Sequence, residues 1–189
     1  MTRIGIVIGS TRPGRSGEAV GRWVHEIAAR RDDAQYELID LAQQELPPLD
    51  EAIPPMAGMY AQPHTLAWAE RIARLDGFVF VTPEYNHSVP AALKNAVDYL
   101  FAEWGNKAAG FVGYGPLGAT RAVEHLRLIL SEVRMATVRT QVALTFATDF
   151  EDRTVFRPSP ENTALVDELL DQVVLWSEAL EPVRRKASA

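Results

Sequence analysis

Short apolar runs alternate with longer amphipathic segments along this 189-residue chain. Runs rich in Val, Ile and Phe predict five β-strands, at Arg3–Gly9, Tyr36–Leu41, Gly77–Thr82, Ala109–Tyr114 and Val138–Thr145. The first and third runs are almost continuously apolar, which is typical of central parallel strands covered on both faces.

Segments with helical periodicity lie between and after these strands. They predict helices at Gly17–Arg31, His64–Leu75, Val89–Glu103, Gly118–Arg134 and Glu161–Glu181. Repeated strand–helix alternation predicts a parallel α/β sheet with right-handed crossovers, in a single domain over residues 1–189. The tail Val183–Ala189 is expected to fray in solvent.

The longest irregular segment spans residues 42–63. It holds five of the twelve prolines: Pro47, Pro48, Pro54, Pro55 and Pro63. A loop of this length is either functional or mobile, or it is a surface excursion that covers the sheet edge. The second interpretation is the one we expect.

Composition narrows the class of protein. Hydrophobic residues make up 47% of the chain and charged residues 23%, which excludes a disordered chain. A net charge of −6 disfavours nucleic acid and anionic membrane surfaces as partners. Without cysteine there is no disulfide, thiolate metal site or cysteine nucleophile. No apolar run approaches the roughly 20 residues of a membrane helix, and no signal peptide is evident, so we expect a cytoplasmic protein.

The loop after the first strand has the residues to hold a phosphate. Between Gly9 and the predicted helix it carries three hydroxyl groups, in Ser10, Thr11 and Ser16. It also carries two guanidinium groups, in Arg12 and Arg15. Backbone N–H groups at the helix start would point at the same anion. The alternative is a polar turn in which Ser16 only caps the helix.

Two further loops follow strands at the same edge of the sheet. After the third strand, Pro83-Glu84-Tyr85-Asn86-His87 forms a proline-bracketed excursion with an aromatic side chain, which suits the edge of a flat heterocycle. Alternatively, His87 is a surface turn residue, and Tyr85 is a half-buried aromatic residue that packs the loop. After the fourth strand, Gly113, Gly115 and Gly118 would let the backbone approach a ligand closely.

Other chemistries find no support. The first loop lacks both a nucleotide-triphosphate loop ending and the G-x-G-x-x-G pattern. Neither Ser10 nor Ser88 lies in a G-x-S-x-G elbow. The four histidines show no metal-ligand spacing, so no metal is predicted.

Taken together, three motifs resemble the NADPH-dependent FMN reductase family. They are Gly9-Ser10-Thr11-Arg12 with Arg15, Pro83-Glu84-Tyr85-Asn86, and Leu93-Lys94-Asn95-Ala96-Val97-Asp98. The similarity covers roughly Arg3–Thr145. It implies a flavodoxin-like three-layer α/β sandwich, with five parallel strands in the order 2-1-3-4-5 and helices on both faces.

The resemblance also implies a cofactor and its contacts. Ser10, Arg12, Arg15 and Ser16 would hold the phosphate of FMN, with Thr11 beside them. Pro83, Glu84, Tyr85 and Asn86, with His87, would line the isoalloxazine edge, and Gly115 and Gly118 would close the other side. The family often has Gly-Gly where this chain has Gly118-Ala119.

The implied activity is hydride transfer from NADPH or NADH through FMN to a quinone-like or other small acceptor, by ping-pong kinetics. The flavin carries the chemistry, so no protein residue is expected to be catalytic. Two alternatives remain at this point: a non-enzymatic flavodoxin-type electron carrier, and a phosphate-ligand-binding regulatory module on the same fold.

The helix at Val89–Glu103 predicts a homodimer or a dimer of dimers. One side forms an apolar stripe, but the opposite side carries small residues and a single charge, in Ala91, Asn95, Asp98 and Ala102 with Tyr99 at the margin. In the next helix, Leu128 points away from the apolar stripe. Two-fold packing of these helices would bury both surfaces, although a few exposed apolar residues are also normal.

Overall fold

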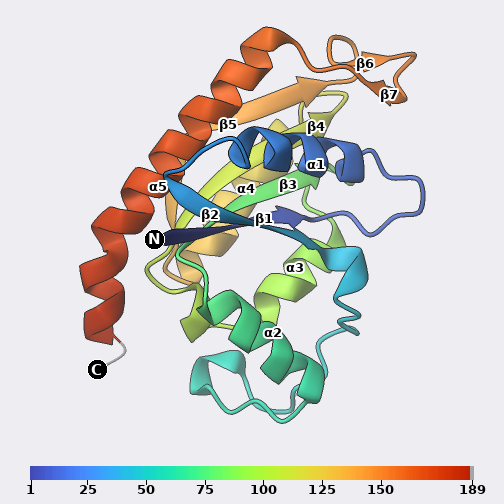
Figure 1. Ribbon diagram of the computed structural model, residues 1–189. Helices are drawn as coiled ribbons and strands as arrows, with labels where there is room; N and C mark the ends of the chain where they lie inside the picture. Colours follow the sequence, from blue (N-terminus) through green and yellow to red (C-terminus); the bar gives the residue numbers. More distant parts are fainter. Residues whose placement is uncertain (188–189) are drawn as a thin grey trace.

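Five parallel strands form the central sheet of the computed structural model, which describes residues 1–187 (Figure 1). The strands are β1 (Thr2–Ile8), β2 (Ala34–Asp40), β3 (Gly77–Pro83), β4 (Ala108–Gly115) and β5 (Ala136–Thr145). Their order, β2-β1-β3-β4-β5, confirms the predicted flavodoxin-like order. Every residue of β3 and β4 is buried, because both faces of the sheet are covered by helices.

Helices cover the two faces in two layers, as Figure 1 shows. One face carries α1 (Gly17–Ala28) and α5 (Pro160–Ala187); the other carries α2 (Pro63–Ala73), α3 (Ala91–Asp98) and α4 (Thr120–Glu132). Each layer has its own apolar core against the sheet. The five helices and five strands that the periodicity predicts are all present, with ends shifted by a few residues.

Helix α3 ends at Asp98 and not at the predicted Glu103. The chain then turns inward through a short 3-10 helix at Ala102–Trp104. Trp104 is only 1% exposed, and its indole N–H donates to Val97 O at 3.1 Å. Burial of this large aromatic ring outweighs continuation of the helix.

Helix α5 continues through Ala187, where we expected a frayed tail over residues 183–189. Arg184 explains the difference: its guanidinium pairs with Asp76 at 2.8 Å and donates to Asn106 O at 3.2 Å, which ties the last turns to the sheet. Residues 188–189 lie outside the described residues.

A small hairpin, β6 (Phe150–Glu151) and β7 (Val155–Phe156), was not predicted. Its turn uses Asp152 and Arg153 at positive φ and contains no glycine, so the usual turn signal is missing from the sequence. Phe156 packs edge-on against Trp23, with ring centroids 5.3 Å apart, and so covers the middle of α1.

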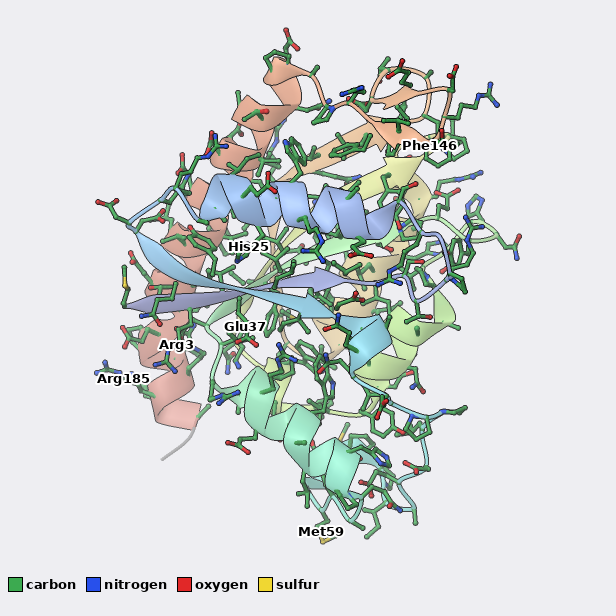
Figure 2. All side chains as sticks on the ribbon, turned by 45° about the vertical axis from the view of Figure 1, so that its right-hand side comes forward. Arg3, His25, Glu37, Met59, Phe146 and Arg185 are labelled. Atoms are coloured by element: carbon green, nitrogen blue, oxygen red, sulfur yellow. The ribbon has the colours of Figure 1, made fainter. Side chains whose placement is uncertain are left out.

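The segment 42–63 packs on α3 and does not cover the sheet edge, which corrects our expectation. The Asn95 side-chain amide donates to Pro47 O at 2.7 Å and accepts from Leu49 N at 2.9 Å. The Tyr99 hydroxyl donates to Pro47 O at 3.0 Å. Figure 2 shows Met59 at the far end of this segment, pointing away from the sheet.

Within residues 1–187, no helix combines the length and apolar character that crossing a membrane requires.

Candidate functional site

The loops after β1, β3 and β4 meet at the carboxyl edge of the sheet, on the right of Figure 1. The Tyr85 hydroxyl lies 2.6 Å from Ser10 Oγ, which joins the second predicted loop to the first. Glu84 forms an ion pair with Arg121 at the start of α4, which joins the second loop to the third. The structure therefore brings the three predicted loops together, as ligand sites in open α/β sheets require.

The first loop forms an open turn over the edge of β1. Ser10 is fully buried, whereas Thr11 and Arg12 are exposed. The Arg15 N–H donates to Arg12 O at 3.3 Å and closes the turn. Gly14 has φ +68°, and nothing lies within 4 Å of the position of a Cβ, so the space over this turn is free.

Arg15 is held by a partner that sequence reasoning missed. Its guanidinium pairs with Asp40, the last residue of β2, and both side chains are almost buried. The other oxygen of Asp40 accepts from Ala42 N at 3.0 Å, which fixes the carboxylate. A carboxylate at the end of the second strand is the only sequence signal that could have pointed to Asp40.

The guanidinium of Arg15 keeps an unused donor. Its Nε is buried and has no hydrogen-bond partner. A buried N–H without a partner costs free energy, and an anion in this turn would remove that cost with a charge-assisted bond. The donor set at the first loop therefore fits a phosphate.

Ser16 does not cap α1 through its side chain, although it occupies the N-cap position. The alternative in which this loop is only a serine-capped turn is therefore not realised. The hydroxyl leaves the first-turn N–H groups of α1 to another acceptor, and such N–H groups favour an anion.

The second loop contains a tight two-residue turn. Tyr85 and Ser88 pair through their backbones at 2.9 and 3.1 Å, and Asn86 and His87 adopt φ of 49° and 73° between them. Positive φ is costly for a residue with a Cβ, so the surrounding contacts must hold this turn. Pro83 is buried, and Asn86 and His87 are exposed at the tip.

Glu84 has a different partner from the one its place in the motif suggests. Its carboxylate pairs with Arg121 and accepts a hydrogen bond from Ala122 N at 3.3 Å. It therefore binds the N-terminal end of α4, where backbone N–H groups have no partner within the helix. The hydrogen bond from Arg121 and the backbone donors hold the pKa of Glu84 below its usual range. Glu84 thus anchors α4 to the second loop. The position of Glu84 in the sequence gives no indication of this contact.

The backbone of the third loop, which follows β4, packs very closely against neighbouring residues. A Cβ at Gly113 would lie 2.2 Å from Gly118 O, so only glycine fits there. Gly115 has φ +143° with open space beside it, and Gly118 has φ +61°. Ala119 also has positive φ (53°) and is buried, so its methyl group packs inside the protein.

His87 and His125 form the outer rim of this region. Their ring centroids are 5.7 Å apart, and His125 Nδ1 lies 3.1 Å from Ser88 Oγ. Among residues 1–187 there is no group of three or more His, Cys, Asp or Glu side chains able to hold a metal ion.

Comparison with known proteins gives the same fold and related enzymes. Residues 2–149 match the profile of the family described as NADPH-dependent FMN reductase. The chain is 38% identical over 181 residues to a NAD(P)H-dependent FMN reductase of Schizosaccharomyces pombe, covering 95% of this chain and 90% of the relative. It is 36% identical over 131 residues to the quinone reductase of Escherichia coli K12, covering 66% of each chain.

Solved structures share the architecture. The flavoenzyme NAD(P)H:(acceptor) oxidoreductase FerB of Paracoccus denitrificans superposes with a TM-score of 0.73 at 22% identity, covering 95% of this chain and 98% of that one. At this identity the match supports the fold alone.

Proposed function

This chain belongs to the NADPH-dependent FMN reductase family, and from that premise we propose that it passes hydride equivalents from NAD(P)H, through FMN, to a quinone-like acceptor by ping-pong kinetics. The enzyme class and the FMN cofactor follow from family membership. The non-enzymatic carrier and the regulatory module are thereby set aside. The acceptor, the kinetic order and the contacts of individual residues are the proposal.

The buried, partnerless Nε of Arg15 carries the proposed cofactor site. It lies in a turn with free space over Gly14 and beside the uncapped start of α1, which suits the phosphate of FMN. Ser10, Thr11, Arg12 and Ser16 would surround the same phosphate.

When bound, FMN supplies the hydride chemistry, and the protein supplies position and access. Pro83, Tyr85 and the turn at Asn86 and His87 would set the flavin edge. Gly115 and Gly118 would bring backbone to the opposite side. Glu84, by anchoring α4, would hold these two loops at a constant separation.

The proposal predicts a yellow protein that a nicotinamide nucleotide reduces without help. Freshly purified protein should show a flavin spectrum, with released FMN identified by its mass. Anaerobic mixing with NADPH or NADH alone should bleach that spectrum in a stopped-flow experiment. A colourless protein that does not bind added FMN would contradict the proposal.

We expect parallel lines in double-reciprocal plots of rate against nicotinamide at several quinone concentrations. Nicotinamide and acceptor would use the same open face of a ring held against three loops, so the oxidised nicotinamide must leave before the acceptor enters. Intersecting lines would mean that both substrates bind together, and the shared-face proposal would be wrong.

We also propose a homodimer or dimer of dimers through α3 and α4. The free surface that supports it is smaller than the helical periodicity suggested. Asn95 on the second face of α3, and Tyr99 directly after the end of that helix, are covered by the chain's own residues 47–50. Ala91 on α3 and Ala102 in the 3-10 helix that follows it are exposed. Leu128 on α4 is 69% exposed.

The free edge of β5 is a poor alternative interface. Arg127 donates to Val138 O at 2.6 Å, and Thr140 N donates to the Gln172 side chain at 3.1 Å. Side chains of the same chain therefore already bond to backbone N–H and C=O groups of the β5 edge that a second sheet would have to pair with.

We expect light scattering at micromolar concentration to give at least twice the monomer mass. The double variant Ala102→Arg, Leu128→Glu should be monomeric, because charge at a buried interface is costly. Leu175→Glu, at an equally exposed leucine on α5, is the matched control and should not change the mass. A wild type of monomer mass would refute the dimer, and a dimeric double variant would refute the choice of α3 and α4.

A further inference from the structure

A cavity lies at the amino edge of the sheet, opposite the edge that carries the loops of the proposed cofactor site. Its walls come from the end of α2, the segment between α3 and β4, the turn between α4 and β5, and the last turns of α5. Arg185, one of its lining residues, is labelled at the left of Figure 2. The volume is about 590 Å³, and small-molecule sites typically measure roughly 300–1,000 Å³.

Lys107 contributes a buried ammonium group to the wall of this cavity. The residue is only 4% exposed, and Nζ donates to Ile72 O at 2.6 Å and to Ala73 O at 3.3 Å. Its remaining contact is the face of the Phe78 ring, with the centroid 5.8 Å from Nζ. An ammonium group has three N–H donors, so among residues 1–187 one donor of this buried cation has no acceptor atom and no carboxylate forms an ion pair with it.

Arg134 brings a second cation without an acceptor. Its guanidinium lies over the ring of Phe101, 5.4 Å from the centroid, and donates no hydrogen bond to any side chain or carbonyl in the described part of the chain. The residue directly follows the C-cap of α4 and has φ 60°, a conformation that favours glycine. An arginine here strains the backbone without gaining a hydrogen bond, and strain of this kind is concentrated at ligand sites.

The acidic side chains of the cavity set the charge that a ligand should have. All three are already hydrogen-bonded within the chain: Asp76, Glu103 and Glu181. Two of them form ion pairs with arginines of α5, Arg184 and Arg185. While the lysine is protonated, the described lining residues carry one more positive than negative charge. A single negative charge on a ligand therefore compensates the cavity, whereas a dianion would be repelled by the carboxylates.

We propose that this cavity binds a small organic monocarboxylate, whose oxygens accept charge-assisted hydrogen bonds from Lys107 and Arg134. Such bonds would satisfy the unused donors of both cations. The apolar body of the acid would contact the apolar part of the wall, which includes Ala73, Leu75 and Ala102. Because the site lies at the opposite edge of the sheet, the inference does not rest on the proposed function.

Binding should depend on pH through Lys107. Burial, helped by the charge of Arg184 and opposed by Asp76 and Glu103, lowers the pKa of Lys107 to about 7. The other described lining residues are not of types that titrate between pH 6 and 8. A carboxylate stays ionised over this range, and the protonated lysine is the form that attracts it. Affinity should therefore be about tenfold higher at pH 6 than at pH 8, in proportion to the protonated fraction.

The test is titration of the purified protein with benzoate, followed by NMR through the backbone amide signals of Asn106 and Lys107. Arg134→Gly should weaken binding by about ten- to a hundredfold, the size of one charge-assisted hydrogen bond. It should not lower resistance to urea, because glycine adopts this φ without strain. Arg153→Gly is the matched control: this exposed arginine has φ 59° in the turn between β6 and β7, and its substitution should leave benzoate affinity unchanged.

Two further probes and one further variant test the role of charge. Benzamide, the neutral counterpart of benzoate, should not bind, and the dianion sulfate should bind more weakly than benzoate. Lys107→Met should remove the difference between pH 6 and pH 8.

Three results would overturn the inference: no saturable shift of the Asn106 and Lys107 signals, equal wild-type affinity at pH 6 and pH 8, or undiminished binding in Arg134→Gly. Undiminished binding that also changes the flavin spectrum would place benzoate at the flavin instead. None of these results would contradict the FMN site, which the flavin spectrum of the purified protein tests separately.

Discussion

Arg15→Ala is expected to weaken binding of FMN to the apoprotein by about ten- to a hundredfold. A hydrogen bond to a charged group contributes roughly 1.5–3 kcal/mol, and about 1.4 kcal/mol corresponds to one factor of ten. Arg15 is the arginine of the first loop whose guanidinium is both nearly buried and left with a partnerless Nε. Arg12 is exposed, so its substitution should have the smaller effect.

Riboflavin and a second substitution identify the cause of the loss. Riboflavin should bind the wild type and Arg15→Ala about equally poorly, because it has no phosphate. Arg15→Ala also leaves Asp40 unpaired beside the phosphate, so the double variant Arg15→Ala, Asp40→Asn separates repulsion from lost attraction. Under our assignment the double variant stays at least tenfold weaker than the wild type, since the phosphate still lacks its donor.

Arg22→Ala is the matched control, because this exposed arginine of α1 bonds to Glu18 and lies outside the proposed site. It should leave FMN affinity unchanged. Wild-type affinity in both Arg15→Ala and Arg12→Ala would show that the phosphate is held elsewhere.

The free energy of unfolding is expected to rise by roughly 2 kcal/mol between pH 7 and pH 9 because of Lys107. Its side chain is only 4% exposed, and Nζ donates to Ile72 O at 2.6 Å, at the carboxyl end of α2. Burial, helped by the charge of Arg184, lowers the pKa of Lys107 to about 7. An unfolded lysine has a pKa near 10.4.

The direction follows from proton counts. Below pH 7 both states hold the proton, and the folded state bears the full cost of burying the charge. As the pH rises from 7 toward 10, the folded state has lost the proton while the unfolded state still binds it. Folding stability therefore increases with pH in this window.

Urea unfolding at pH 7, 8 and 9 would measure this slope, with Lys107→Met as the comparison. The variant should lack the rise, whereas Lys94→Met, at a half-exposed lysine paired with Asp98, should keep it. The scan stops at pH 9 because unfolded tyrosines begin to ionise above it. Equal slopes in the wild type and Lys107→Met would show that Lys107 keeps its charge in the fold.

Periodicity alone was sufficient to predict the five strands, the five helices and a parallel sheet, whereas the strand order came from the resemblance to the family. Strands buried on both faces are necessarily apolar throughout, and helices on one face necessarily show an apolar stripe, so burial is visible in the local pattern. The loops that carry the proposed site were also visible, since carboxyl ends of parallel strands must share an edge. Element ends were less predictable, and α3 stops early because Trp104 is drawn into the core.

The sequence by itself therefore determined which segments form the fold and which loops meet. Only the tertiary structure decided the partners within those loops. Asp40 with Arg15, Tyr85 with Ser10, and Glu84 with Arg121 join residues 25 to 75 positions apart. The physical reason is that periodicity reports only whether a side chain is buried, whereas these contacts depend on the paths of loops. For the same reason the second face of α3 looked free for a second copy, and only the course of residues 47–50 showed that the chain covers much of it itself.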